Sequence, residues 1–384
     1  MSEIVEQPNV VIDLGSSMMK AGYSNEASPS ALICSFLARP KYNKILSNEL
    51  SKDIIGPDKS LRGLYQLEKL IERGKFVHAS DLKKVMGKIL EDMDITSEVE
   101  LPLFFTEPIF TSSSTRASIA DTLLLDRHAG KLAFGTQGVL SLFALGKTDG
   151  VVLSSGAELT QVTSVSGGLR LDHGCTKIEF GGNEVSVQLK SLLRSSGHSI
   201  DCSNELLLFD EMKKSVVEAV LMSADEQRFQ SKAQLDLESR KKQNEIKYEL
   251  PDGNEIVIKS ERFSAVEILF NPAQAGYEFQ GLHELLDSSL KNLDLDLRKL
   301  FYKNIFLSGG NTMITGFPER LSQEMEALMS DKNLLGIWAP RVERSNLDWE
   351  GGAVMSKLSS FSNFWVTAKD LEEHGERIFA QKIV

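Results

Sequence analysis

The stretch Asn9-Val-Val-Ile-Asp-Leu-Gly-Ser-Ser-Met-Met-Lys20 decides the fold class. Residues 9–13 form a short β-branched run that ends at the turn Gly15-Ser16, and this pattern predicts a buried strand. The strand delivers the Asp13 carboxylate to a glycine turn, whose exposed backbone N–H groups can bind phosphate oxygens. Lys20, on the returning strand, can neutralise such oxygens. Taken alone, the pattern also fits a plain hairpin, because Asp-x-Gly-Ser turns are common.

The same order of elements returns in the second part of the chain. Its parts are, in order, the apolar run 151–153, the turn Ser154-Ser155-Gly156, the strand 159–165, the turn Gly167-Gly168 and the strand 169–171. Two copies of strand, glycine turn and strand favour a duplicated α/β domain with a cleft between the halves.

Further strands and helices follow from the apolar periodicity. A strand at 304–307 enters Ser308-Gly309-Gly310 and precedes a helix whose apolar face carries Leu321, Met325 and Leu328. Helices are also predicted at 81–93, 138–145 and 205–222. The segments 41–54 and 223–247 lack a sustained apolar period, and we expect both to be mobile.

Composition limits the functional classes. The chain has 384 residues, enough for two domains, and its formal net charge of −11 disfavours direct binding to nucleic acid or an anionic membrane. The three cysteines, Cys34, Cys175 and Cys202, are scattered, which suits a reducing compartment. Residues 1–8 lack a basic-then-apolar signal region, and the apolar runs are too short to span a bilayer. We therefore expect a soluble protein of the cytosol or nucleus.

The segments downstream of the first glycine turn resemble the actin family, in order and along nearly the whole chain. They include Arg39-Pro40, Gly56, Arg62-Gly63, Thr106-Glu-Pro108, the run 137–150, Tyr248-Glu-Leu-Pro-Asp-Gly253, Arg262-Phe263, Glu267-Ile-Leu-Phe-Asn-Pro272, Leu307-Ser-Gly-Gly310, Trp349-Glu-Gly-Gly352 and Phe364-Trp365. So many collinear matches identify the chain as a member of the family of actins and actin-related proteins. The segments 294–298 and 304–307 look slightly closer to the dynactin-type actin-related protein than to conventional actin.

The resemblance implies the α/β fold of the superfamily that actin shares with hexokinase and heat-shock protein 70. In that fold two related domains, each split into two subdomains, enclose a nucleotide cleft. We expect an outer half at 1–145, to which 346–384 return, and an inner half at 146–345. The predicted loop 41–54 belongs to the outer half, and a charged insertion at about 223–247 belongs to the inner half.

The resemblance also implies the roles of the first phosphate loop. Asp13, Gly15, Ser16 and Lys20 match the family, in which the aspartate orders water molecules on the metal, while the serine and lysine contact phosphates. Gln137 matches the glutamine that helps orient the attacking water.

The second phosphate loop departs from the family pattern of Asp-Ser-Gly-Asp-Gly followed by His. It keeps Gly156, but Ser154 and Ala157 replace the two aspartates, Glu158 replaces the last glycine and Gln161 stands in place of the histidine. Glu158 would add negative charge next to the phosphates unless its side chain turns to solvent. Loss of the acid and the histidine predicts little hydrolysis.

The residues expected around the nucleoside match the family only in part. Residues that match the family's pocket are Gly182, Lys213, Gly309, Gly310 and Met313. Lys214 replaces a glutamate expected at the ribose, Ile314 replaces an aromatic residue, and Ser345 falls where a lysine packs on the base. We expect ATP or ADP with Mg²⁺ to be bound weakly or statically.

Three functional classes remain open. The first is a structural subunit of a cytoskeletal, motor-associated or chromatin assembly, partnered by other actin-family subunits and located in the cytoplasm, with the cilium or nucleus as alternatives. The second is a polymerising actin-like ATPase that forms or caps filaments. The third, a small-molecule kinase of the wider superfamily, lacks a spare segment for a sugar pocket.

Overall fold

The computed structural model describes residues 8–41, 53–57, 65–78, 80–95, 100–125, 129–198, 200, 205–221, 245–251, 253–340 and 343–382. Nearly all of the predicted mobile segments 41–54 and 223–247 lie outside these residues, as do Arg62, Gly63 and Cys202.

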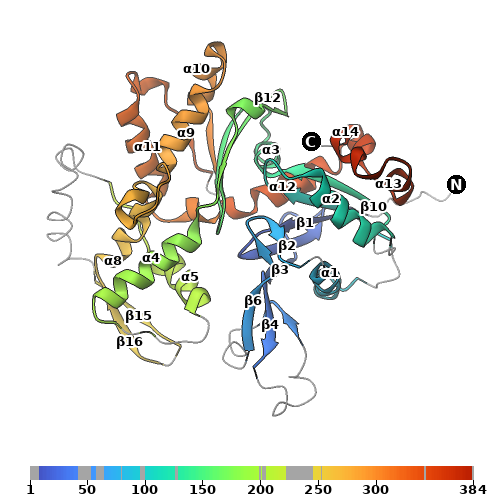
Figure 1. Cartoon of the computed structure of the whole chain (residues 1–384). Helices are drawn as coiled ribbons and strands as arrows, with labels where there is room; N and C mark the ends of the chain where they lie inside the picture. The colour runs from blue at the N-terminus through green and yellow to red at the C-terminus, as the bar shows by residue number, and fades with distance from the viewer. Residues whose placement is uncertain are drawn as a thin grey trace.

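Two mixed sheets of the same design form the centre of the molecule (Figure 1). The first contains, in spatial order, β10 (Lys131–Thr136), β9 (Pro102–Glu107), β1 (Val10–Leu14), β2 (Met18–Tyr23) and β3 (Ala31–Cys34). The second contains β18 (Ile337–Trp338), β17 (Ile305–Ser308), β11 (Gly150–Ser155), β12 (Thr160–Ser166) and β13 (Leu169–Arg170), with β14 (Thr176–Ile178) also paired to β12.

The strand directions repeat as well as the order. β1 is parallel to β9 and antiparallel to β2, and β11 is likewise parallel to β17 and antiparallel to β12. The duplicated α/β fold predicted from the two glycine turns is therefore confirmed. We call the first sheet with its attached elements the first lobe, and the second sheet with its attached elements the second lobe.

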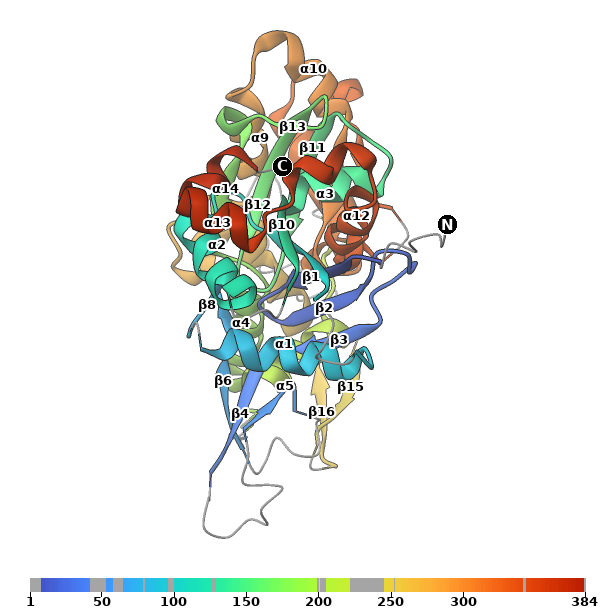
Figure 2. The ribbon, with the colours of Figure 1, turned by 90° about the vertical axis from the view of Figure 1, so that its right-hand side faces the viewer.

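Two helices pack the sheets against each other. α3 (Gln137–Ala144) and α12 (Leu347–Met355) lie side by side in both ribbon views (Figure 2). They cross closely, because a Cβ atom added at Gly351 would lie only 1.8 Å from the Leu140 carbonyl oxygen. The apolar core around them takes side chains from both sheets, such as Val11 and Val152, and from α12 itself, such as Trp349.

Smaller elements extend each lobe on the side of the predicted cleft (Figure 1). On the first lobe these are β4 (Phe36–Pro40), β5 (Ile54–Ile55), β6 (Tyr65–Lys69), β7 (Ile71–Glu72), β8 (Lys75–Phe76) and α1 (Asp81–Asp92). On the second lobe they are α4 (Gly182–Ser195), α5 (Glu205–Val216), β15 (Ile246–Glu249), β16 (Glu255–Ile258) and α8 (Glu261–Ser264).

The remaining helices cover the outer faces of the sheets. They are α2 (Ser113–Ala120), α9 (Leu282–Lys291), α10 (Leu295–Lys303), α11 (Phe317–Leu328), α13 (Ala368–His374) and α14 (Ile378–Gln381). The C-terminal segment joins the first sheet, because Leu132 and Val366 exchange backbone hydrogen bonds of 2.8 and 2.7 Å. The predicted division into an outer and an inner half, with the return of 346–384 to the outer half, stays a prediction. Among the described residues, no helix is long and apolar enough to cross a bilayer.

Two details of the sequence prediction were wrong. The helix expected at 205–222 ends at Val216, because the backbone N–H of Ala219 instead donates to the Thr315 carbonyl oxygen at 2.8 Å. Glu218 also forms a parallel bridge with Thr315. On α11, Leu321 and Met325 are buried as expected, but Leu328 is 42% exposed at the end of the helix.

Candidate functional site

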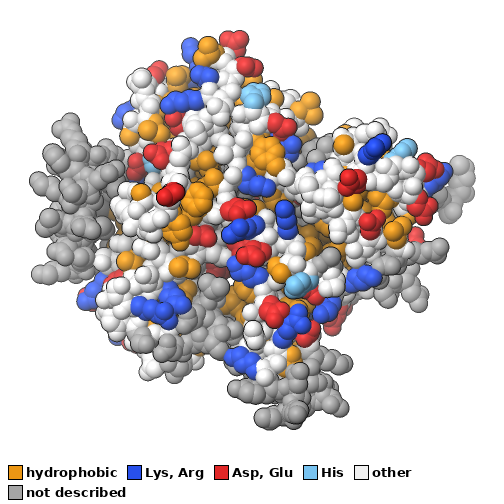
Figure 3. Space-filling view, viewed as in Figure 1, with side chains coloured by type: hydrophobic (Ala, Val, Ile, Leu, Met, Phe, Trp, Pro, Cys, Tyr) orange, Lys and Arg blue, Asp and Glu red, His pale blue; other side chains and the backbone are white. Residues whose placement is uncertain are grey.

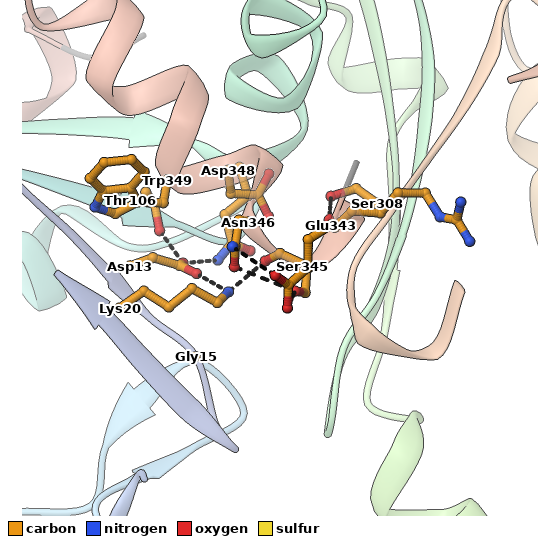
Figure 4. Close-up of polar contacts among 12 residues, drawn as sticks. Asp13, Gly15, Lys20, Thr106, Ser308, Glu343, Ser345, Asn346, Asp348 and Trp349 are labelled. Atoms are coloured by element: carbon orange, nitrogen blue, oxygen red, sulfur yellow. Dashed lines mark hydrogen bonds and ion pairs between the residues drawn. The ribbon is translucent and has the colours of Figure 1, made fainter. Parts of the chain in front are cut away.

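Asp13 and Lys20 form the centre of the predicted first phosphate loop. They are paired directly across β1 and β2, which places both side chains on one face of the sheet. The Lys20 Nζ atom lies 2.9 Å from Asp13 Oδ2 and donates to the Ser345 carbonyl oxygen at 2.5 Å (Figure 4). Burial alone would lower the pKa of Lys20, but the charge of Asp13 and its hydrogen bond raise it above its usual value. Lys20 therefore stays a cation.

The second oxygen of Asp13 is also engaged. Asp13 Oδ1 accepts from Thr106 Oγ1 at 2.5 Å and from Gln137 Nε2 at 3.3 Å, so the carboxylate is held at both oxygens. Thr106 belongs to a motif noted in the sequence, but its contact with Asp13 was not foreseen. The predicted residues Gly15 and Ser16 form the turn between β1 and β2, where a Cβ atom on Gly15 would lie 2.4 Å from the Met18 carbonyl oxygen.

Gln137 is held in one orientation by Gln161. The backbone N–H of Ile109 donates to Gln161 Oε1 at 3.0 Å, and this bond directs Gln161 Nε2 toward Gln137 Oε1, at 2.8 Å. Gln161 is only 2% exposed. The side-chain oxygen of Gln137 could accept a hydrogen bond from a water molecule, and one of its two lone pairs is already used by Gln161.

The second phosphate loop supplies no acid at Ser154 or Ala157 to hold a metal. Among the described residues, no group of three or more His, Cys, Asp or Glu side chains is placed to bind a cation. The residues therefore do not fit a metal held by several protein ligands. The predicted role of Asp13, which would act through metal-bound water, stays a prediction.

Glu158 does not turn to solvent. Its side chain is 6% exposed and contacts Lys69 Nζ, the backbone N–H of Arg73 at 2.6 Å and Asn183 Nδ2 at 3.1 Å. Sequence reasoning missed these partners, because Lys69 and Arg73 belong to the other lobe.

At the predicted nucleoside pocket, Lys213 forms an ion pair with Asp210, an acid that the sequence prediction overlooked. Its Nζ atom lies 2.7 Å from Asp210 Oδ1 and donates to the Gly182 carbonyl oxygen at 2.8 Å. Lys214 Nζ contacts the other Asp210 oxygen at 2.6 Å. Although burial works against the charged carboxylate, the two lysines lower the pKa of Asp210. The spacing of three and four residues on α5 was the available signal.

The glycines of the two loops on the second lobe lie together. Gly309 has φ = +87°, and a Cβ atom there would lie 2.4 Å from the Ser155 carbonyl oxygen. Asn311 Nδ2 donates to Ser155 Oγ at 3.0 Å and to the Gly156 carbonyl oxygen at 2.8 Å, and it was not foreseen. The backbone N–H of Gly182 also donates to the Gly156 oxygen.

Asp348 is a buried acid next to the first phosphate loop. It accepts a hydrogen bond of 2.5 Å from Ser141 Oγ, which also contacts Ser308 Oγ at 3.0 Å. Burial and the nearby charge of Asp13 raise the pKa of Asp348 to about 7, although Ser141 and Lys20 oppose the shift. No pattern in the sequence pointed to Asp348 as a member of the site.

Comparison with known proteins identifies the family. The family model described as actin matches residues 4–384. The chain belongs to the actin family. An actin-like protein of Neurospora crassa is 32% identical over 381 residues, which cover 98% of this chain and 99% of that protein. A centractin of Schizosaccharomyces pombe is 32% identical over 384 residues, which cover 99% of each.

Within this actin-family fold, the predicted residues form two groups. Asp13, Lys20 and Gln137 are in contact, and they lie beside the turn that holds Gly15 and Ser16. The second group, on the second lobe, contains Gly156, Gly182, Lys213 and Gly309. Gly310 has open space around it, and Met313 is 42% exposed. Leu14, next to Asp13, lines a pocket of about 290 Å³ with Ile71 and Phe76.

Proposed function

We propose that this actin-related chain is a structural subunit of a larger cytoskeletal assembly and holds ATP with little hydrolysis. One observation carries the proposal: the Gln161 amide donates to Gln137 Oε1 at 2.8 Å. A hydrolytic site needs an acceptor to position the attacking water, and here one of the two lone pairs of that acceptor, Gln137 Oε1, is bonded within the protein. With Ser154 in place of an acid, and with Glu158 bonded to Lys69 and Arg73, the second loop also offers no unpaired carboxylate for the water shell of a metal.

The kept half of the site supports nucleotide binding. Lys20 is a largely buried cation beside the turn at Gly15 and Ser16, and a lysine next to the backbone N–H groups of a glycine turn suits phosphate oxygens. If bound, ATP would supply a polyphosphate that Lys20 and this turn neutralise, and Mg²⁺ would be held mainly by phosphate and water, with Asp13 ordering that water. Binding of this kind stabilises the fold by mass action without turnover.

The partners and location that we propose follow the similarity to centractin and to the actin-like protein. Other actin-family subunits are the expected neighbours, and the cytoplasmic cytoskeleton is the expected location. The charge of −11 argues against direct binding of nucleic acid or an anionic membrane.

A polymerising ATPase is the second candidate. The contacts that Asp13 makes with Lys20 and Gln137 favour it, because they hold together three side chains that an ATPase of this family would use.

The nucleotide content of the purified protein separates the two candidates. The protein is denatured, and ATP and ADP are quantified by chromatography. Mostly ATP supports the structural subunit, whereas mostly ADP, with phosphate release that rises as the protein pellets in ATP and Mg²⁺, would favour the polymerising ATPase. A protein without nucleotide would contradict the proposed role of ATP.

A further inference from the structure

Glu158 connects the two lobes of the molecule. It lies in the turn between β11 and β12 on the second lobe, and its carboxylate contacts Lys69 at the end of β6 on the first lobe. The same carboxylate accepts from the backbone N–H of Arg73, in the turn between β7 and β8, at 2.6 Å. Asn183 on its own lobe donates to it at 3.1 Å. We call these four residues the Glu158 cluster.

The Glu158 cluster satisfies a buried charge. Oε1 accepts from Lys69 and Asn183, and Oε2 accepts from Arg73, so both carboxylate oxygens are bonded. Glu158 is 6% exposed, and the Lys69 side chain is 27% exposed. A carboxylate so far removed from water is costly unless it stays paired, and separation of the lobes would remove two of its three donors.

The turn between β7 and β8 is shaped to reach the second lobe. Arg73 and Gly74 have φ values of +51° and +77°, as in a tight two-residue hairpin turn. A positive φ is unfavourable for arginine, and the hydrogen bond from its N–H to Glu158 offsets that strain. The tip of the turn also packs on the second lobe, since a Cβ atom on Gly74 would lie 3.3 Å from Leu159 Cδ1.

Two further contacts also join the first lobe to the second. Arg73 Nη1 lies 2.7 Å from Glu179 Oε2, and Lys177 Nζ donates to the Ile109 carbonyl oxygen at 2.9 Å. Basic and acidic side chains gather midway between the lobes on the face shown in Figure 3. The Arg73–Glu179 pair is more than half exposed at both side chains, so water and salt screen it, unlike the Glu158 cluster.

We infer that the Glu158 cluster holds the two lobes closed through contacts within the protein, in place of closure that depends on a bound nucleotide. The inference does not rest on the proposed function, because all four members of the cluster belong to the chain itself. Its consequence is a fixed relative orientation of the lobes. A fixed orientation suits a protein that offers its surface to neighbours.

The test is hydrogen exchange of the full-length protein over residues 70–76, which include the Arg73 amide, combined with the radius of gyration from small-angle X-ray scattering. Glu158→Ala removes all three bonds, and Lys69→Met removes only the charged pair. Glu179→Ala is the matched control, because it breaks the exposed pair at the same turn. Nucleotide content is quantified in every variant, so that opening of the lobes is distinguished from loss of nucleotide.

We expect exchange over 70–76 to be at least tenfold faster in Glu158→Ala, severalfold faster in Lys69→Met and unchanged in Glu179→Ala. The radius of gyration should rise in the first two variants even when their nucleotide content equals that of the wild type. Unchanged exchange and radius in a folded Glu158→Ala protein would overturn the inference. If Glu158→Ala does not fold, Lys69→Met is the test. Hydrogen exchange in that variant at the wild-type rate would then overturn the inference.

Discussion

Ser154 is paired with Gln161 across β11 and β12 in the same register that pairs Asp13 with Lys20 across β1 and β2. The two sheets thus present equivalent positions to the predicted nucleotide site. The first sheet has a carboxylate and an ammonium there, and the second has a hydroxyl and an amide. The two sheets therefore keep the same geometry at this position, but only the first sheet carries charged side chains there.

The first prediction concerns hydrolysis. Ser154→Asp combined with Gln161→His should raise ATP hydrolysis by roughly tenfold to a hundredfold, because the aspartate can order metal-bound water and the Gln137 carbonyl is released from Gln161. Phosphate release under single-turnover conditions measures the change.

Gln161→Ala is the control for this experiment. It frees the Gln137 side-chain oxygen but adds no carboxylate to order metal-bound water, so we expect its rate of hydrolysis to rise by less than that of the double variant. A wild-type rate that already equals the rate of the double variant would contradict the proposed loss of hydrolysis.

The sequence predicted the loops better than it predicted their partners. The strand ending at Asp13 and the turn at Gly15 are local patterns, and both lie where they were expected. The end of α5 at Val216 depends instead on Thr315, which is distant in sequence and competes for the backbone N–H of Ala219. The spacing of apolar residues along the chain carries no information about a competing partner that is distant in sequence.

Glu158 shows the same limit within the candidate site. Its type and position predicted a charge next to the phosphates, but its orientation depends on Lys69 and Arg73 in the other lobe. Pairing between residues that are far apart in sequence is set by tertiary packing. Asp348 is similar, because its burial beside Asp13 follows from the packing of α12 on β1.

The second prediction concerns the close approach of two glycine loops. Gly309 has φ = +87° and ψ = 160°, a conformation almost confined to glycine, and it faces the Ser155 carbonyl oxygen. Gly309→Ala should therefore lower the free energy of unfolding by about 3 kcal/mol, from backbone strain and the clash together. Thermal and urea unfolding measure the loss.

Gly310→Ala is the matched control, one residue further on. No atom lies within 4 Å of the Cβ position of Gly310, and its φ is not positive, so we expect a change within about 1 kcal/mol. Equal losses in the free energy of unfolding would contradict the prediction, because they would show that the close contact with Ser155 does not require glycine at position 309.

The third prediction concerns pH and Asp348. Its pKa of about 7 in the folded protein lies above the ordinary 3.8, so between these values the folded state binds more protons than the unfolded state. This group therefore makes the protein less stable as the pH rises from 4 to 7. Asp348→Asn has no carboxyl group to ionise. Its free energy of unfolding relative to that of the wild type should therefore rise between pH 4 and 7, by a total of about 4 kcal/mol at most, and should not rise further above pH 7.

Urea unfolding at a series of pH values from 5 to 8 tests this difference. Asp149→Asn is the control, because the backbone N–H of Gly167 and the Thr148 hydroxyl hold the pKa of Asp149 below its usual value. The stability that Asp149 contributes is lost only as the pH falls below about 4, so its difference from the wild type should stay flat between pH 5 and 8. A flat difference for Asp348→Asn as well would contradict the raised pKa.

The last prediction concerns Arg320 on α11, which is 1% exposed. Its guanidinium lies 2.5 Å from Glu267 Oε1 and 2.9 Å from Oε2, and its Nε atom lies 2.8 Å from Glu324 Oε1. Arg320→Met keeps much of the volume but leaves two largely buried carboxylates unpaired. The free energy of unfolding should fall by about 3–5 kcal/mol, since removing one partner of a buried ion pair exposes the full desolvation cost of the other.

Lys247→Met provides the comparison on the surface. Lys247 pairs with Glu255 at 3.0 Å, but the two side chains are 72% and 58% exposed, and we expect a loss below about 1 kcal/mol. Both variants are compared with the wild type by urea unfolding at one ionic strength. If Arg320→Met loses no more than Lys247→Met, the carboxylates of Glu267 and Glu324 must regain water or protons in the folded state, and the Arg320 pairs would not be what fixes α11 to the second lobe.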